Sequence, residues 1–233
     1  MRQPTDITPL TFLDYPNKAA CILWFNGCNL RCPYCYNPDL ALARNTANQD
    51  VIPFLRERRE FLDAVVISGG ECTLNPDIRE LCTRIKALGY LVKIDTNGSN
   101  PAVLHDLLDA QLIDYVAMDH KMPAARSWKV QGGGVLFDRF SACMQLLTQS
   151  RIGFEVRTTV HPILLDEADI LQMIRESVGL GYNKTYYLQY FFDAGKTLGN
   201  LPPPSRRYDR GLLDERSPLP IGYRNFPEDR FKY

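Results

Sequence analysis

The sequence lacks three features that would restrict its partners. It has no net charge, because 27 Lys and Arg balance 27 Asp and Glu, so it carries no electrostatic signature for a nucleic-acid backbone or an anionic membrane surface. It also has no apolar run long enough to span a bilayer, and no apolar segment of a secretion signal near its start. We therefore expect a cytoplasmic protein, with neither nucleic acid nor membrane as partner, that acts on a small molecule or on another protein.

The seven cysteines do not form the even set of a disulfide framework. In a reducing cytosol, thiols serve metals or chemistry rather than disulfides. Three of them lie close together with Cys-x3-Cys-x2-Cys spacing, and they are Cys28, Cys32 and Cys35. The remaining four are scattered and offer no set for a second metal cluster: Cys21, Cys72, Cys82 and Cys143.

Short apolar, β-rich runs alternate with helical patterns along most of the chain. This alternation predicts βαβ units on a parallel sheet. The chain is short for a closed barrel of eight units, so the expected fold class is α/β, an incomplete (β/α)6 parallel barrel over residues 1–198. The Pro- and Arg-rich residues 199–233 are expected to form an irregular C-terminal tail. The predicted strands are 19–25, 64–68, 90–95, 114–119, 152–160 and 185–192, and the predicted helices are 50–62, 76–88, 137–147 and two that begin near 100 and 166.

Polar and glycine-containing motifs directly follow the predicted strands. In parallel α/β sheets, ligands bind at the carboxyl ends of the strands, so these motifs are candidate site residues. A glycine pair lets the backbone approach a ligand closely, and Glu71 can accept hydrogen bonds from an ammonium group. Taken singly, the glycine pair and Asp95-Thr96-Asn97-Gly98 are also explained as turns, and Asp119-His120-Lys121 as a polar cluster that faces the surface. The motifs are Gly27-Cys28, Gly69-Gly70-Glu71, Asp95-Thr96-Asn97-Gly98 and Asp119-His120-Lys121.

The cysteine triplet allows three interpretations. Three thiolates at this spacing can converge on one soft metal centre. A structural zinc site would need a fourth ligand, and the nearest cysteine, Cys21, lies inside a predicted strand. Three cysteines on a four-iron cluster would instead leave one iron open to a cofactor or substrate. Three buried thiols without a metal are the remaining alternative, for which a loop is a poor location.

Residues 26–37, Asn-Gly-Cys-Asn-Leu-Arg-Cys-Pro-Tyr-Cys-Tyr-Asn, resemble the Cys-x3-Cys-x-aromatic-Cys signature of the radical S-adenosylmethionine (SAM) superfamily. Tyr34 stands at the aromatic position, and the resemblance covers about residues 8–198. It implies a [4Fe-4S] cluster on the three cysteines, with SAM bound to the open iron. One electron from the cluster would cleave SAM to methionine and a 5′-deoxyadenosyl radical.

The resemblance also implies roles for residues outside the cysteine triplet. Gly69-Gly70-Glu71 would hold the amino group of SAM, although Cys72 stands where relatives have proline. Asp95 and Asp119 could bind a monovalent cation beside the carboxylate of SAM, and Lys121 would provide positive charge near that carboxylate. Arg157 matches an arginine that related enzymes direct at the cofactor. The residues expected to bind the cofactor are Tyr34, Tyr36, Gly69, Gly70, Glu71, Asp95, Asn97, Asp119, Lys121, Arg157 and Gln189.

Within the superfamily, the sequence resembles glycyl-radical enzyme activating enzymes, in particular the activating protein of anaerobic ribonucleoside-triphosphate reductase. The residues that carry this resemblance are 11–18, Thr-Phe-Leu-Asp-Tyr-Pro-Asn-Lys, and 26–38. It implies hydrogen abstraction from a backbone glycine of a partner, with anaerobic ribonucleotide reductase as the expected partner and a flavodoxin or ferredoxin as electron donor. Two alternatives stay open: a small-molecule enzyme similar to carboxy-deazaguanine synthase, and a non-catalytic module that binds zinc or a cluster.

Overall fold

The computed structural model describes residues 1–43, 50–130, 135–192 and 195–227. Its strands form one eight-stranded sheet in chain order, β1 to β8. Strand β1 runs antiparallel to β2, and each later strand runs parallel to the one before it. The six predicted strands correspond to β2 to β7 and are confirmed. The bounds are β1 Asp6–Thr11, β2 Ala20–Phe25, β3 Ala64–Gly69, β4 Leu91–Thr96, β5 Tyr115–Asp119, β6 Gly153–Val160, β7 Tyr186–Tyr190 and β8 Ile221–Arg224.

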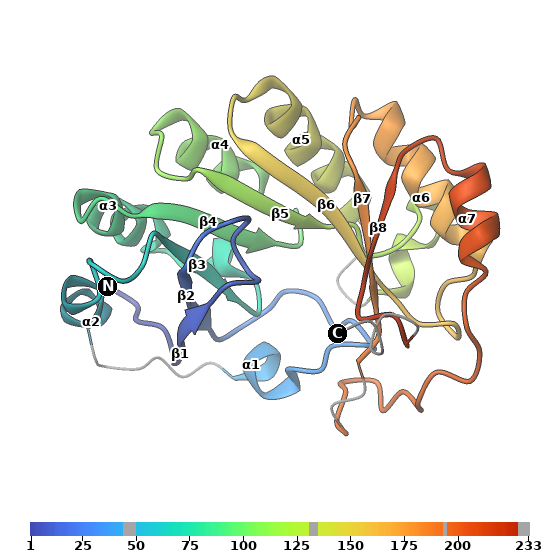
Figure 1. Ribbon diagram of the computed structural model, residues 1–233, viewed down its shortest axis with the longest axis horizontal. Helices are drawn as coiled ribbons and strands as arrows, with labels where there is room; N and C mark the ends of the chain where they lie inside the picture. The colour runs from blue at the N-terminus through green and yellow to red at the C-terminus, as the bar shows by residue number, and fades with distance from the viewer. Residues whose placement is uncertain (44–49, 131–134, 193–194, 228–233) are drawn as a thin grey trace.

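The helices follow the strands, and α3 to α6 lie side by side along one face of the curved sheet (Figure 1). The five predicted helices correspond to α2 to α6. Helix α3 begins later than the expected residue 76, because the side chain of Asn75 accepts a hydrogen bond from the backbone of Asp77 and holds a turn there. The bounds are α1 Pro38–Leu42, α2 Val51–Glu57, α3 Ile78–Ala87, α4 Pro101–Asp109, α5 Leu136–Gln149, α6 Glu167–Gly179 and α7 Arg210–Arg216, with 3₁₀ helices η1 Cys72–Leu74 and η2 Ala124–Lys129.

The main hydrophobic core lies between the sheet and these helices. Because successive side chains of a strand point to opposite faces, every second strand residue belongs to this core. The helices contribute apolar residues three or four positions apart, which lie on one helical face. Burying such a side chain stabilises the fold by about 1.5–3 kcal/mol. Examples that are fully buried are Leu23, Ile67, Ile94, Val116 and Val156 from the strands and Leu81, Leu107, Met144 and Ile170 from the helices.

The opposite, inner face of the sheet is apolar at one end and charged at the other. Towards the amino ends of the strands, a second small core contains Tyr15, Ile22 and Val66. Further along the strands the same face carries charged side chains, among them Asp95 and Arg157, which form ion pairs across the sheet. The fold therefore directs polar side chains to the carboxyl ends of the parallel strands.

The described strands do not close into a barrel, because the edge strands β1 and β8 do not pair with each other. This confirms the incomplete parallel barrel. No helix among the described residues is long and apolar enough to cross a membrane.

The region beyond residue 198 is more regular than expected. Residues 201–207 are irregular, but α7 and β8 follow, and β8 pairs in parallel with β7. Strand β8 was not predicted, because it has only four residues and follows Pro218 and Pro220. The division into a domain at 1–198 and a tail at 199–233 stays a prediction, and residues 228–233 lie outside the described ranges.

Candidate active site

A cavity of about 210 Å³ lies at the carboxyl ends of the parallel strands. The loops after β2, β3, β4 and β5 form much of its wall, and Arg157 of β6 and Gln189 of β7 complete it. Every residue expected to bind the cluster or SAM lines this cavity except Glu71, whereas the motif residues Gly27, Gly98 and His120 do not line it. The lining residues predicted from the sequence are Cys28, Cys32, Tyr34, Cys35, Tyr36, Gly69, Gly70, Asp95, Asn97, Asp119, Lys121, Arg157 and Gln189.

The three thiols of the triplet reach the cavity from the loop that links β2 to α1. The loop turns at Gly27, whose φ of 93° favours glycine, and it is closed by a hydrogen bond from the backbone N–H of Gly27 to the carbonyl of Leu40 at 2.8 Å. Burial raises the pKa of Cys32 to about 11, although the positive charge of Lys121 acts to lower it. A metal binds the deprotonated thiolate form of cysteine, and the positive charge of Lys121 favours that form.

A second segment holds the cysteine loop from outside. The backbone N–H groups of Leu198 and Gly199 donate to the carbonyls of Cys35 and Pro33, both at 2.9 Å. A Cβ on Gly199 would lie 2.7 Å from Cβ of Pro33, so only glycine fits without a shift. We call residues 197–200 the strap. Sequence reasoning missed it, because a contact between residues so far apart in the chain leaves no local pattern.

The glycine pair after β3 packs backbone against backbone. A Cβ on Gly69 would lie 2.2 Å from the carbonyl oxygen of Phe25, and a Cβ on Gly70 would lie 2.1 Å from that of Gly27. The two loops are joined by hydrogen bonds from Gly70 N–H to Phe25 O at 2.9 Å and from Glu71 N–H to Gly27 O at 2.8 Å. The pair therefore places the end of β3 directly against the start of the cysteine loop.

Glu71 points into the protein and away from the cavity, with an exposure of 2%. Its carboxylate accepts hydrogen bonds from Thr73 Oγ1 at 2.6 Å, from Thr96 Oγ1 at 2.8 Å and from the backbone of Asn97 at 2.7 Å. Burial raises its pKa, against the effect of these hydrogen bonds. Glu71 thus links the loops after β3 and β4 and positions Asn97. Its predicted contact with a cofactor amino group stays a prediction.

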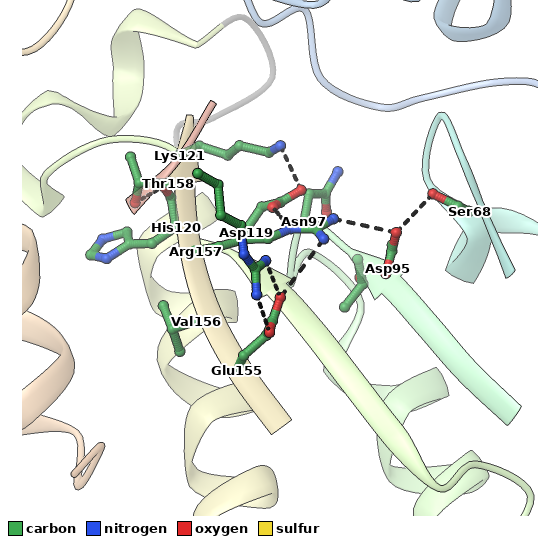
Figure 2. A network of polar contacts seen from close by, with 12 residues as sticks. Ser68, Asp95, Asn97, Asp119, His120, Lys121, Glu155, Val156, Arg157 and Thr158 are labelled. Atoms are coloured by element: carbon green, nitrogen blue, oxygen red, sulfur yellow. Dashed lines mark hydrogen bonds and ion pairs between the residues drawn. The ribbon is translucent and has the colours of Figure 1, made fainter. Parts of the chain in front are cut away.

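Arg157 bridges the two carboxylates at the ends of β4 and β5 (Figure 2). Its Nε donates to Asp119 at 2.7 Å and its Nη2 lies 3.4 Å from Asp95. Lys93 pairs with Asp95 at 2.8 Å, and Lys121 pairs with Asp119 at 2.9 Å. Burial acts to raise the pKa of both acids, but the attraction to these cations outweighs it. The pKa of Asp95 falls to about 2, and the pKa of Asp119 is lowered as well.

This arrangement bears on the expected monovalent cation. Two neighbouring carboxylates need an opposite charge to stay ionised together. Here Arg157, Lys93 and Lys121 supply that charge, so the two acids are compensated by this chain itself. The cation stays a prediction, and the repulsion that motivated it is already relieved by side chains.

Cys72 does not belong to the cavity. It is 1% exposed, and its thiol donates to the backbone carbonyl of Asp95 at 3.2 Å. Cys21, Cys82 and Cys143 are equally buried in the core. The triplet therefore supplies every cysteine that lines the cavity.

Several lining residues were missed by the sequence analysis, among them Asp14, Trp24, Ser68 and Thr159. We call Lys93, Asp95, Asp119, Lys121 and Arg157 the charged cluster. Ser68 contacts this cluster, because its hydroxyl donates to Asp95 at 3.1 Å. A signal existed for Thr159, because it follows Arg157 by two residues on the same strand and therefore faces the same side. Asp14 had no such signal, since it reaches the cavity from the loop before β2.

The donor set identifies the kind of group that this site can hold. Three thiols face one cavity, while the two nearby acids are engaged in ion pairs. In the described ranges, no three His, Cys, Asp or Glu side chains are arranged to hold a single metal ion. Three soft ligands fit a four-iron cluster better than a structural zinc site, which needs four ligands. Fold and site together define an α/β partial barrel whose cavity combines three thiols with a charged ligand pocket, a donor set that suits an iron–sulfur cluster.

The sequence profile of the radical SAM superfamily matches residues 22–176, and the chain belongs to this superfamily. This match confirms the resemblance seen in the sequence. The cofactors of the superfamily are a [4Fe-4S] cluster and SAM, as expected. When bound, the cluster would supply the electron for SAM cleavage, and the residues that line the cavity are those that would hold both groups.

Three relatives of known name are similar to this chain. A protein of Methanocaldococcus jannaschii named "Putative glycyl-radical enzyme activating enzyme" is 37% identical over 174 residues, which cover 70% of each chain. The 7-carboxy-7-deazaguanine synthase of Methanopyrus kandleri is 31% identical over 166 residues and 61% of each chain. The pyruvate formate-lyase-activating enzyme of Clostridium pasteurianum is 28% identical over 169 residues and 66% of each chain.

Among solved structures, SuiB of Streptococcus suis bound to the precursor peptide SuiA has a TM-score of 0.63 at 15% identity. The match covers 88% of this chain and 48% of that chain, so this chain spans about half the length of SuiB. This likeness supports the fold alone.

Proposed function

We propose that this protein activates a glycyl-radical enzyme. It would cleave SAM reductively and use the resulting 5′-deoxyadenosyl radical to take a hydrogen atom from a glycine Cα of the partner. The products would be methionine, 5′-deoxyadenosine and a glycyl radical in the partner. The observation that carries the proposal is the 37% identity to the archaeal protein named as a glycyl-radical enzyme activating enzyme, which extends over 70% of both chains.

In this proposal Cys28, Cys32 and Cys35 bind the cluster. The three thiols line one cavity, and the other four cysteines are buried elsewhere. Each cysteine would supply one thiolate ligand to a four-iron cluster, which would leave one iron open to SAM. Tyr34 is buried, and its ring lies under the ammonium group of Lys121, 5.8 Å from the ring centre, so the aromatic residue keeps this cation near the thiols.

The charged cluster is the proposed site for the amino-acid part of SAM. The side chains of Arg157 and Lys121 line the cavity and supply positive charge for a carboxylate. Asn97 and Gly70 also line the cavity, from the loops after β4 and β3. Gln189 and Tyr36 are proposed contacts for the nucleoside part, and Tyr36 is 47% exposed.

The proposed substrate is a glycine-containing loop of another protein. The described sheet is open between β1 and β8, which supports access of a polypeptide from the side. A glycine lacks a side chain that would obstruct the approach to Cα. We propose anaerobic ribonucleotide reductase as the partner, a flavodoxin or ferredoxin as the electron donor, and the cytoplasm as the compartment, since its reducing conditions suit seven free thiols.

Electron paramagnetic resonance tests this function. The reconstituted, reduced protein is mixed anaerobically with SAM and an anaerobic ribonucleotide reductase. The proposal expects a glycyl-radical doublet on the reductase, which disappears with the Cys32→Ala variant and with a reductase whose radical glycine is replaced by alanine. SAM cleavage without any protein radical would reject this partner.

The second candidate is a small-molecule enzyme, supported by the 31% identity to 7-carboxy-7-deazaguanine synthase. It predicts SAM-dependent conversion of a small-molecule substrate by the protein alone. Product from that substrate, together with an unmodified reductase, would favour this candidate over the first.

A further inference from the structure

Strand β8 brings one arginine into the charged cluster of the active site. The side chain of Arg224 forms two parallel hydrogen bonds to the carboxylate of Glu155, at 2.8 Å and 2.9 Å. Glu155 belongs to β6 and lies two residues before Arg157, on the same face of the strand. Strand β8, which lies in a segment expected to be an irregular tail, thus contacts Glu155, a neighbour of the cavity-lining Arg157.

Glu155 has two cationic neighbours, and they hold it unequally. Its side chain is 6% exposed, so its charge needs a partner inside the protein. Nη1 of Arg157 lies 3.9 Å from the carboxylate of Glu155 (Figure 2). Arg224, in contrast, holds this carboxylate in bidentate geometry. Arg157 is consequently directed towards Asp119 and Asp95, the side on which the cavity lies.

We propose that Arg224 is a positioning residue for SAM binding, because it neutralises Glu155 and thereby leaves the guanidinium of Arg157 to the cavity. Without Arg224, the buried carboxylate of Glu155 has Arg157 as its nearest cation. Arg157 then turns from the cavity towards Glu155, and the pocket loses positive charge for the carboxylate of SAM. This inference rests on membership of the radical SAM superfamily and does not depend on which partner is activated.

A second arginine beyond residue 198, Arg206, also forms an ion pair and provides a matched control. Arg206 binds Glu167 through two hydrogen bonds, at 2.7 Å and 3.0 Å, and its guanidinium stacks over Tyr208 as that of Arg224 stacks over Tyr187. Neither Arg206 nor Glu167 lines the cavity. Loss of Arg206 removes a similar pair from the same part of the chain without touching the charged cluster.

The test measures the Kd of SAM by isothermal titration calorimetry on the reconstituted, unreduced protein, together with the thermal midpoint of each variant. Arg224→Met is expected to raise the Kd about tenfold, within the range of coupling between neighbouring charges. Arg224→Lys keeps the positive charge and is expected to raise the Kd by a smaller factor. Arg206→Met is expected to leave the Kd unchanged.

The double variant decides whether the effect passes through Glu155. Glu155→Gln removes the carboxylate that would attract Arg157, so adding Arg224→Met to it is expected to change the Kd less than twofold. The Glu155→Gln background also keeps the test valid if Arg224→Met alone fails to fold. An unchanged Kd in Arg224→Met, or an equal loss of affinity in the Glu155→Gln background, would overturn the proposal. Radical transfer to a partner is not part of the readout, so a wrong partner cannot be mistaken for this failure.

Discussion

The strap over the cysteine loop predicts that one methyl group, far from the cysteines in sequence, weakens cluster binding. In Gly199→Ala the new Cβ would lie 2.7 Å from Cβ and 2.8 Å from Cα of Pro33. Ordinary carbon–carbon contacts need about 3.5–4.0 Å, so the strap or the loop must move by about 1 Å. That movement also stretches the two hydrogen bonds that Leu198 and Gly199 donate to Cys35 and Pro33.

The expected free-energy cost follows from these contacts. Overpacking by a methyl group costs about 1–3 kcal/mol, and each lost backbone hydrogen bond costs about 0.5–1.5 kcal/mol. A net loss of about 2 kcal/mol reduces the ratio of docked to undocked strap by about thirtyfold. Pro33 lies between Cys32 and Cys35, so an undocked strap leaves two of the three cluster ligands less well held.

The assay compares iron and sulfide content per chain after anaerobic reconstitution, and the rate at which a chelator removes the iron. Gly199→Ala is expected to lose iron several times faster than the wild type. Gly179→Ala is the control, because a Cβ there has no neighbouring atom within 4 Å. Equal iron loss from wild type, Gly199→Ala and Gly179→Ala would refute the role of the strap.

Three further predictions concern individual side chains. Cys72→Ala is expected to retain full iron content, because the thiol of Cys72 donates to the backbone away from the cavity. Cys32→Ala is expected to lose the cluster, and iron analysis of both variants measures the difference. Glu71→Gln is expected to lower the free energy of unfolding by about 2–3 kcal/mol, because a buried carboxylate that accepts several hydrogen bonds is replaced, and urea unfolding that shows no change would contradict this. The pKa of Asp95, about 2, lies below that of an unfolded aspartate, about 3.9. Its ionisation therefore stabilises the fold above about pH 4 by about 2–3 kcal/mol, and this stabilisation is lost as the pH falls towards 2. Asp95→Asn should therefore flatten the acid limb of the stability curve between about pH 4 and 2, and an unchanged slope would contradict that assignment.

The sequence predicts those parts of the site that are built from local motifs. The cysteine spacing, the glycine pair and the residues after β4 and β5 are each encoded within a few positions, and the parallel sheet brings their ends together. For this reason Cys28, Gly70, Asn97 and Lys121 were all predicted to share one site, and they line one cavity.

The features that were not predicted depend on contacts between distant segments. The strap meets the cysteine loop across more than 160 residues, and Arg224 meets Glu155 across 69. Neither contact has a local pattern. The internal hydrogen bonds of Glu71 are a further example, because the motif does not specify that its carboxylate accepts from Thr73, Thr96 and Asn97. Side-chain direction depends on the packing of both loops and cannot be taken from the motif.

The most direct test of the proposed function follows one hydrogen atom. The reduced, reconstituted protein is incubated with SAM and a partner reductase that carries deuterium at the Cα of its glycines. The proposal predicts 5′-deoxyadenosine that contains one deuterium, together with a glycyl radical on the partner. Unlabelled 5′-deoxyadenosine formed in the same amount with or without the partner would contradict it.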